Sequence, residues 1–169
     1  MILSALMAAA LAHAWTEYAY RDTGVAISFP APPSEGQSAY PAGERPVPAT
    51  VYSLQLGAEE FSLAVADFAG RPREQARAVR DALAMLTDGG EVKENLPACV
   101  DGRSGRSLTL AGKDGSRARV SVFSMGKQIY FLEARIPPGA GDPAEAVRFQ
   151  QSLRFTGPAP QPACRPSAR

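Results

Sequence analysis

Residues 104–136, SGRSLTLAGKDGSRARVSVFSMGKQIYFLEARI, decide the fold of this chain. Apolar and polar residues alternate in three segments of this stretch, which is the period of a β-strand: 104–111, 117–124 and 128–136. The intervening runs Lys113-Asp114-Gly115 and Met125-Gly126-Lys127 are typical of tight turns. The stretch therefore predicts three antiparallel strands joined as a meander.

More strands are predicted before the meander. They comprise a hairpin over 15–21 and 25–29 around Asp22-Thr23-Gly24, a second pair over 51–56 and 60–68, and a strand over 91–99. Within 60–68, Phe61 and Leu63 alternate with small residues such as Ala64, so we expect the sheet to be covered on both sides. Residues 30–50 hold six prolines, which lack amide donors, and predict a long surface loop with no central strand.

Two helices are predicted. In residues 71–88 apolar residues recur every three or four positions, beginning at Pro72 and ending before Gly89-Gly90. The second begins at Asp142-Pro143-Ala144-Glu145, which matches a capping box with proline at the first helical position. Together these elements predict an α+β fold: a single antiparallel sheet of about seven strands with two helices packed on it.

The first fourteen residues have the pattern of an export signal. An apolar run ends in Ala12-His13-Ala14, a small-x-small sequence that signal peptidase cleaves, and it is shorter than the roughly 20 residues that span a bilayer. The alternative is a buried N-terminal helix. We predict a signal peptide over 1–14, one domain over 15–155, a proline-rich tail over 156–169, and a periplasmic or secreted location without a transmembrane segment.

The chain holds two cysteines, Cys99 and Cys164. An even pair in an oxidising compartment predicts a disulfide, and the alternative is two free thiols. A redox-active role is disfavoured because the pair is not a C-x-x-C motif and no histidine lies nearby to lower a thiol pKa.

Composition excludes several functions. Among 169 residues the net charge is +1, too small to favour nucleic acid as a partner. The only histidine, His13, lies in the predicted signal, so the mature domain has no imidazole for serine or cysteine catalysis or for a histidine-containing zinc site. Neither common glycine-rich phosphate-binding motif occurs, so we expect no cofactor and no metal.

One stretch is locally basic. Between Arg103 and Arg135 there are seven Lys or Arg residues against two acidic ones. Guanidinium groups bind carboxylates and phosphates through paired hydrogen bonds. We therefore take four arginines as a candidate face for an anion or a partner: Arg103, Arg106, Arg117 and Arg119. The alternative is a charged outer sheet face that only discourages edge pairing.

Several segments carry a family resemblance. They are Trp15 near the mature start, ISFPAP at 27–32, GRSGR at 102–106, KQIYFL at 127–132 and FQQSLRF at 149–155. With them the chain resembles exported bacterial proteins of uncharacterised function that have a PsbP-like fold. The resemblance implies an α/β/α sandwich with an antiparallel sheet and implies no catalytic or ligand residues.

These observations favour a monomeric, non-enzymatic binding or accessory module of the cell envelope, with an envelope protein or a small ligand as its partner. One alternative is a small hydrolase that works without histidine, through Ser124 and Lys127, spaced as in serine–lysine enzymes, or through a glutamate pair such as Glu91 and Glu94. Another is a binder of polyanions or anionic membrane surfaces through the Arg103 to Arg135 face.

Overall fold

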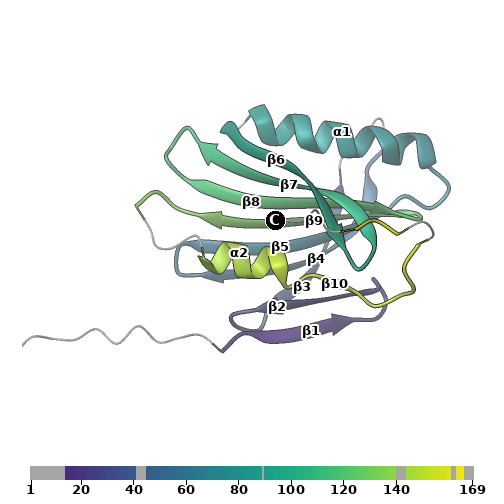
Figure 1. The fold of residues 1–169 in the computed structure, drawn as a ribbon, viewed down its shortest axis with the longest axis horizontal. Coiled ribbons are helices and arrows are strands. Elements are labelled where there is room, and N and C mark those ends of the chain that lie inside the picture. Colours follow the sequence, from purple (N-terminus) through teal and green to yellow (C-terminus); the bar gives the residue numbers. More distant parts are fainter. Residues whose placement is uncertain (1–13, 41–44, 89, 140–143, 161–162, 166–169) are drawn as a thin grey trace, which may run out of the picture.

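The meander predicted over residues 104–136 forms three neighbouring strands of a seven-stranded antiparallel sheet (Figure 1). The structure is a computed structural model that describes residues 14–40, 45–88, 90–139, 144–160 and 163–165. The strands are β1 (Thr16–Tyr20), β2 (Val25–Phe29), β3 (Ser34–Tyr40), β4 (Val47–Leu56), β5 (Glu59–Asp67), β6 (Gly90–Val100), β7 (Arg103–Gly112), β8 (Arg117–Met125), β9 (Gln128–Ile136) and β10 (Arg154–Phe155). The helices are α1 (Pro72–Asp88) and α2 (Ala144–Gln151).

The large sheet has the strand order β3-β4-β5-β9-β8-β7-β6. Two hairpin series, β3 to β5 and β6 to β9, meet where β5 pairs with β9, for example at Leu63 opposite Leu132. Both turns of the predicted meander are present, because β7, β8 and β9 follow one another as antiparallel neighbours. The antiparallel sheet and the two helices confirm the predicted α+β class and the predicted α/β/α sandwich.

Both faces of the large sheet are covered, as the alternation in β5 predicts. Phe61 and Leu63 face a core formed with α2 and with β2. Ala66 belongs to the core on the opposite face, to which α1 contributes Ala78. Figure 1 shows α2 lying over the sheet along the direction of the strands, and α1 running beside β6. The side-chain amide of Gln150 fixes α2 to the sheet through the hydroxyl groups of Ser107 and Ser121 and the carbonyl of Val120.

A second, three-stranded sheet, β1-β2-β10, is a departure from the predicted single sheet. The predicted hairpin over 15–29 is present as β1 and β2, but it does not join the large sheet. Four of the five residues of β2 are buried, and its free edge pairs with β10 after α2. The small sheet therefore packs with α2 on the same face of the large sheet.

The surface loop predicted over residues 30–50 is wrong, because this region contains β3 and the start of β4. No proline lies within β3, which is an edge strand, but β4 pairs with both β3 and β5 from Ala49 onwards, so the exclusion of a central strand from this region is wrong as well. Pro48 lies inside β4, where only β3 is a neighbour, because pairing of β4 with β5 begins at Ala49. Proline is tolerated where one side of a strand needs no amide donor.

The helix predicted over 71–88 is confirmed as α1. Helix α2 begins at Ala144, and the Asp142-Pro143 part of its predicted start lies outside the described residues. The predicted signal peptide also lies outside them, except for Ala14. Among the described residues no helix is long and apolar enough to cross a membrane.

Candidate functional site

Cys99 and Cys164 lie at disulfide distance, with their sulfur atoms 2.06 Å apart and their Cα atoms 5.9 Å apart. The described part of the proline-rich tail is therefore held against the domain. The amide of Cys164 donates to the carbonyl of Gly102 at 2.9 Å, and the amide of Thr156 donates to the carbonyl of Gly24 at 3.0 Å. We call residues 156–160 and 163–165 the tail strap.

The turn between β6 and β7 accommodates the tail strap. Asp101 and Gly102 both have positive φ angles, of 48° and 76°. A Cβ atom on Gly102 would lie 2.9 Å from the Cβ of Ala163, closer than real side chains approach. Glycine is therefore required here both by the backbone conformation and by the close approach of the tail strap.

Arg103 does not lie on an exposed basic face. Its side chain is buried, with 6% of its surface exposed, and its guanidinium lies 5.0 Å from the centre of the Phe155 ring. The guanidinium donates to the carbonyls of Gly157 at 2.7 Å, Pro158 at 2.8 Å and Asp101 at 3.1 Å. Arg103 is therefore a structural residue that anchors the tail strap to the sheet.

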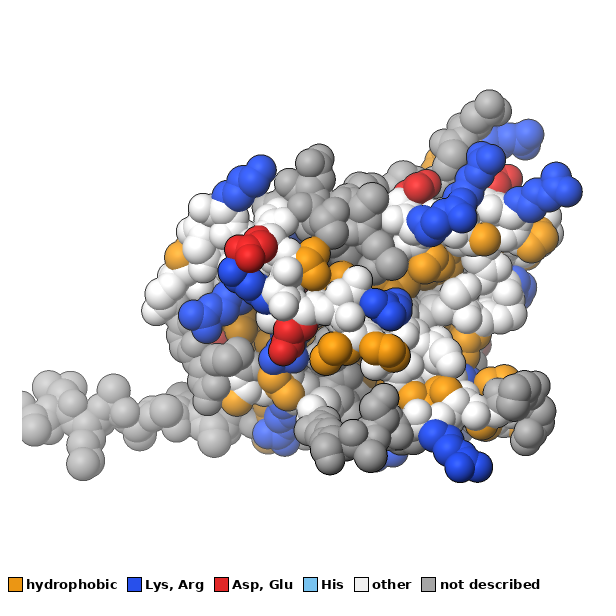
Figure 2. Space-filling model, turned by 45° about the horizontal axis from the view of Figure 1, so that its top comes forward, with side chains coloured by type: hydrophobic (Ala, Val, Ile, Leu, Met, Phe, Trp, Pro, Cys, Tyr) orange, Lys and Arg blue, Asp and Glu red, His pale blue; other side chains and the backbone are white. Residues whose placement is uncertain are grey.

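The other basic residues of the predicted face are also dispersed. Arg106 donates to the side chain of Asn95, Lys127 pairs with Asp67 at 3.2 Å, and Arg135 pairs with Glu133 at 2.8 Å. These residues lie on β7, in the turn between β8 and β9, and on β9. Figure 2 shows the blue basic side chains as separate groups on the face in view, with hydrophobic and acidic side chains among them. The four arginines named above do not form a continuous face.

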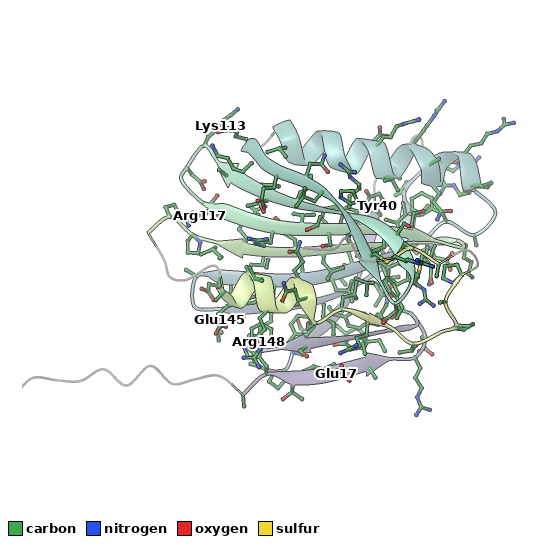
Figure 3. All side chains as sticks on the ribbon, in the orientation of Figure 1. Glu17, Tyr40, Lys113, Arg117, Glu145 and Arg148 are labelled. Carbon is green, nitrogen blue, oxygen red and sulfur yellow. A yellow bond between two sulfur atoms is a disulfide. The ribbon has the colours of Figure 1, made fainter. Side chains whose placement is uncertain are left out.

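Arg117 and Arg119 are the exception, because they project from the same side of β8. Arg117 lies opposite Ala111 of β7 and Ile136 of β9, and Arg119 lies opposite Thr109 of β7. Within the described part of the chain neither guanidinium has a hydrogen-bond acceptor or an ion-pair partner. Figure 3 shows Arg117 with Lys113 at the end of the sheet where β7 turns into β8.

A recess of about 380 Å³ lies at these two arginines; its lining is Lys93, Thr109, Leu110, Ala111, Arg117, Ala118, Arg119 and Ile136. We call it the arginine recess. Its surface is mostly apolar, with the side chains of Ala111 and Ile136 as its floor, and three of its lining residues are cationic. Lys93 occupies a bulge in β6 and pairs with Glu91, while the hydroxyl of Thr109 donates to Glu94 at 2.9 Å. The two arginines thus remain as its unpaired donors.

The turn beside the arginine recess carries one negative charge, at Asp114. The hydroxyl and the amide of Ser116 both donate to this carboxylate, and these hydrogen bonds lower the pKa of Asp114. The Oδ1 atom of this carboxylate is used inside the turn, and Asp114 forms no ion pair with Arg117, three residues further along the chain.

A second cavity, of about 590 Å³, lies at the opposite end of the sheet under the tail strap. Ser104, Ser124, Gln128 and Tyr130 contribute polar groups to it, and Pro158 and Pro160 form one wall. Most of these polar groups already have partners: Ser124 accepts from Gln75 at 3.0 Å, and the Tyr130 hydroxyl lies 2.9 Å from the Thr23 carbonyl. Burial raises the pKa of Tyr130, so the phenol stays protonated. This cavity offers fewer free donors than the arginine recess.

The side chains that the hydrolase alternative would use have hydrogen-bond or ion-pair partners outside the proposed catalytic pairs. Lys127 pairs with Asp67, Ser124 is bound by Gln75, Glu91 pairs with Lys93, and Glu94 accepts from Thr109. The described residues also contain no group of three or more His, Cys, Asp or Glu side chains that could hold a metal ion. Neither the serine–lysine pair nor the glutamate pair forms a catalytic arrangement in this structure.

The antiparallel large sheet, the smaller sheet and the two helices define the class of the protein as an α+β sandwich with a PsbP-like fold. The solution structure of cyanobacterial PsbP (CyanoP) from Synechocystis sp. PCC 6803 is similar, with a TM-score of 0.55 over 90% of this chain and 98% of that chain. The two sequences are 12% identical, so the likeness shows the fold alone. No family model and no curated protein sequence matches the chain.

Proposed function

We propose that this protein is a non-enzymatic binding module of the cell envelope that holds an anionic group in the arginine recess. The observation that carries the proposal is the pair of unpartnered guanidinium groups of Arg117 and Arg119 beside an apolar floor. Arginines that only discourage the pairing of a sheet with other strands do not require a cavity beside them. A cavity with two free bidentate donors fits a carboxylate or a phosphate.

The apolar floor narrows the class of ligand. Ala111 and Ile136 lie on the same side of the sheet as Arg117 and Arg119, and neither offers a side-chain hydrogen bond. An apolar body on the ligand would displace water from this floor, which contributes roughly 25 cal/mol per Å² of apolar surface buried. The recess therefore suits a small amphipathic anion, or an acidic side chain flanked by apolar residues on a partner protein, better than a free inorganic ion.

Octyl phosphate titrated into the protein at low salt is expected to bind more tightly than inorganic phosphate, because only the former covers the apolar floor. The Arg117→Ala/Arg119→Ala variant is expected to weaken octyl phosphate binding by at least about tenfold, since each hydrogen bond to a charged group is worth about 1.5–3 kcal/mol. Isothermal titration calorimetry measures both affinities.

An Arg73→Ala/Arg77→Ala variant is the matched control, because it removes the same charge from exposed positions on α1. It is expected to bind octyl phosphate like the unmodified protein. Equal losses in both double variants would reduce the effect to net charge and contradict the proposal. Heparin binding that is strong and unaffected by Arg117→Ala/Arg119→Ala would favour instead an extended polyanion surface.

We further propose that the chain works outside the cytoplasm after removal of residues 1–14. The disulfide pairing of Cys99 with Cys164 supports this location, since such bonds persist in oxidising compartments. Expression of the full chain in a bacterium is expected to give a periplasmic protein whose intact mass begins at Trp15 and lacks the two thiol hydrogens. Protein that retains Met1 and is recovered from the cytosol would contradict the export proposal.

A further inference from the structure

Strand β3 is an open edge of the large sheet. It pairs with β4 alone, and six of its seven residues are exposed, with only Tyr40 half-buried. The register of β3 with β4 is continuous from Ser34 opposite Ser53 to Tyr40 opposite Val47, without a bulge. Its outer row of amide and carbonyl groups has no strand neighbour among the described residues. Such a row is a template for another strand.

The other edge of the same sheet, strand β6, is protected against pairing with a further strand, whereas β3 is not. Strand β6 has a bulge between Val92 and Glu94, a lysine at the bulge, and Pro97 within the strand. Its end is covered by the disulfide to the tail strap. Bulges, lysine and proline are the usual devices that prevent edge pairing. Strand β3, with the sequence SEGQSAY, has none of them.

We propose that β3 pairs antiparallel with β3 of a second copy of this chain, so that the large sheet continues across a two-fold axis at Gln37. This interface replaces the monomer expected from the sequence and does not depend on the ligand of the arginine recess.

The sequence of β3 is complementary to itself in this register. Gln37 meets Gln37 of the second copy, Gly36 meets Ser38, Glu35 meets Ala39 and Ser34 meets Tyr40. Glu35 is the only charged residue of the strand, and it lies opposite a neutral one. The two Glu35 residues are offset by four positions, or about 13 Å, which exceeds the screening length of roughly 8 Å at physiological salt. Like charges therefore do not oppose the pairing.

Directional cross-linking tests the register. In a Gln37→Cys variant the two introduced cysteines lie opposite each other, with Cβ atoms about 5 Å apart, and mild oxidation is expected to give a covalent dimer. In the control variant, Ser34→Cys, the two cysteines are offset by about 20 Å and are expected to stay uncrosslinked. Both positions are exposed on the same strand. Non-reducing electrophoresis and intact mass measure the dimer.

Charge exchange at Gln37 supplies a second test that needs no oxidation. Gln37→Lys and Gln37→Glu each place like charges opposite one another, and each is expected to weaken self-association by about fivefold in sedimentation equilibrium. An equimolar mixture of the two variants is expected to regain the lost association. Equal cross-linking from positions 34 and 37, a protein that is monomeric at all concentrations, or a mixture that shows no recovery would overturn the proposal.

Discussion

A Cys99→Ala/Cys164→Ala variant is expected to lose about 4 kcal/mol of the free energy of unfolding, because the bond closes a long loop in the unfolded chain. The two cysteines are separated by 65 residues, so the closed loop spans β7, β8, β9, α2 and β10. Cutting this cross-link enlarges the conformational freedom of the unfolded state more than that of the folded state. The urea midpoint should fall, and the dependence of the free energy on urea should steepen as the unfolded chain expands.

The reducing agent supplies the control for this prediction. Unmodified protein in excess dithiothreitol should fall to the stability of the double variant, whose own urea midpoint should not respond to dithiothreitol. Replacement of both cysteines avoids a free thiol that would form mixed disulfides. If the oxidised protein and the double variant unfolded at the same urea concentration, the bond would be absent from the native protein or without effect on it.

Local sequence patterns were sufficient to predict most strands and both helices. The meander of β7 to β9 has alternating residues and glycine-containing turns, and α1 has a helical period from Pro72 onwards. The separation into two sheets could not be predicted in this way. It arises because β10 lies beyond α2 and pairs with β2, a contact between segments more than 120 residues apart that leaves no periodic signal.

Strand β3 shows why composition misled the interpretation of residues 30–50. The six prolines suggested a continuous loop, but they lie outside residues 34–40. The strand itself has small polar residues with little β-strand preference. It forms because β4 presents an unpaired edge, which is a property of the folded sheet and not of the local sequence.

The candidate site was predicted only in part. Arg117 and Arg119 belong to the predicted group of four arginines, and the structure places both on one side of β8. Ala111 and Ile136, which form the floor beside them, come from neighbouring strands and depend on a register that the sequence does not specify. Arg103 was grouped with the exposed arginines because charged residues are mostly exposed, yet here the tail strap covers it.

Replacement of Arg103 by methionine is expected to lower the free energy of unfolding by about 3 kcal/mol, because buried carbonyl groups lose charge-assisted hydrogen bonds while the volume of the side chain is largely kept. The carbonyls of Gly157 and Pro158 would lose their donor, and the Phe155 ring would lose the cation above it. The tail strap should then be attached mainly through Cys164. Urea unfolding measures the loss, and faster hydrogen exchange at the Thr156 amide shows that the tail strap has loosened.

Arg154→Met is the matched control, since Arg154 is an exposed arginine next to Phe155 in the same short strand. It is expected to change the free energy of unfolding by less than about 0.5 kcal/mol, as surface substitutions usually do. Arg103→Lys keeps the charge but not the forked geometry that reaches three carbonyls, so its stability should lie between that of Arg103→Met and that of the unmodified protein. If Arg103→Met were no more destabilising than Arg154→Met, Arg103 would be an ordinary surface arginine. It would then belong again to the candidate face for an anion or a partner.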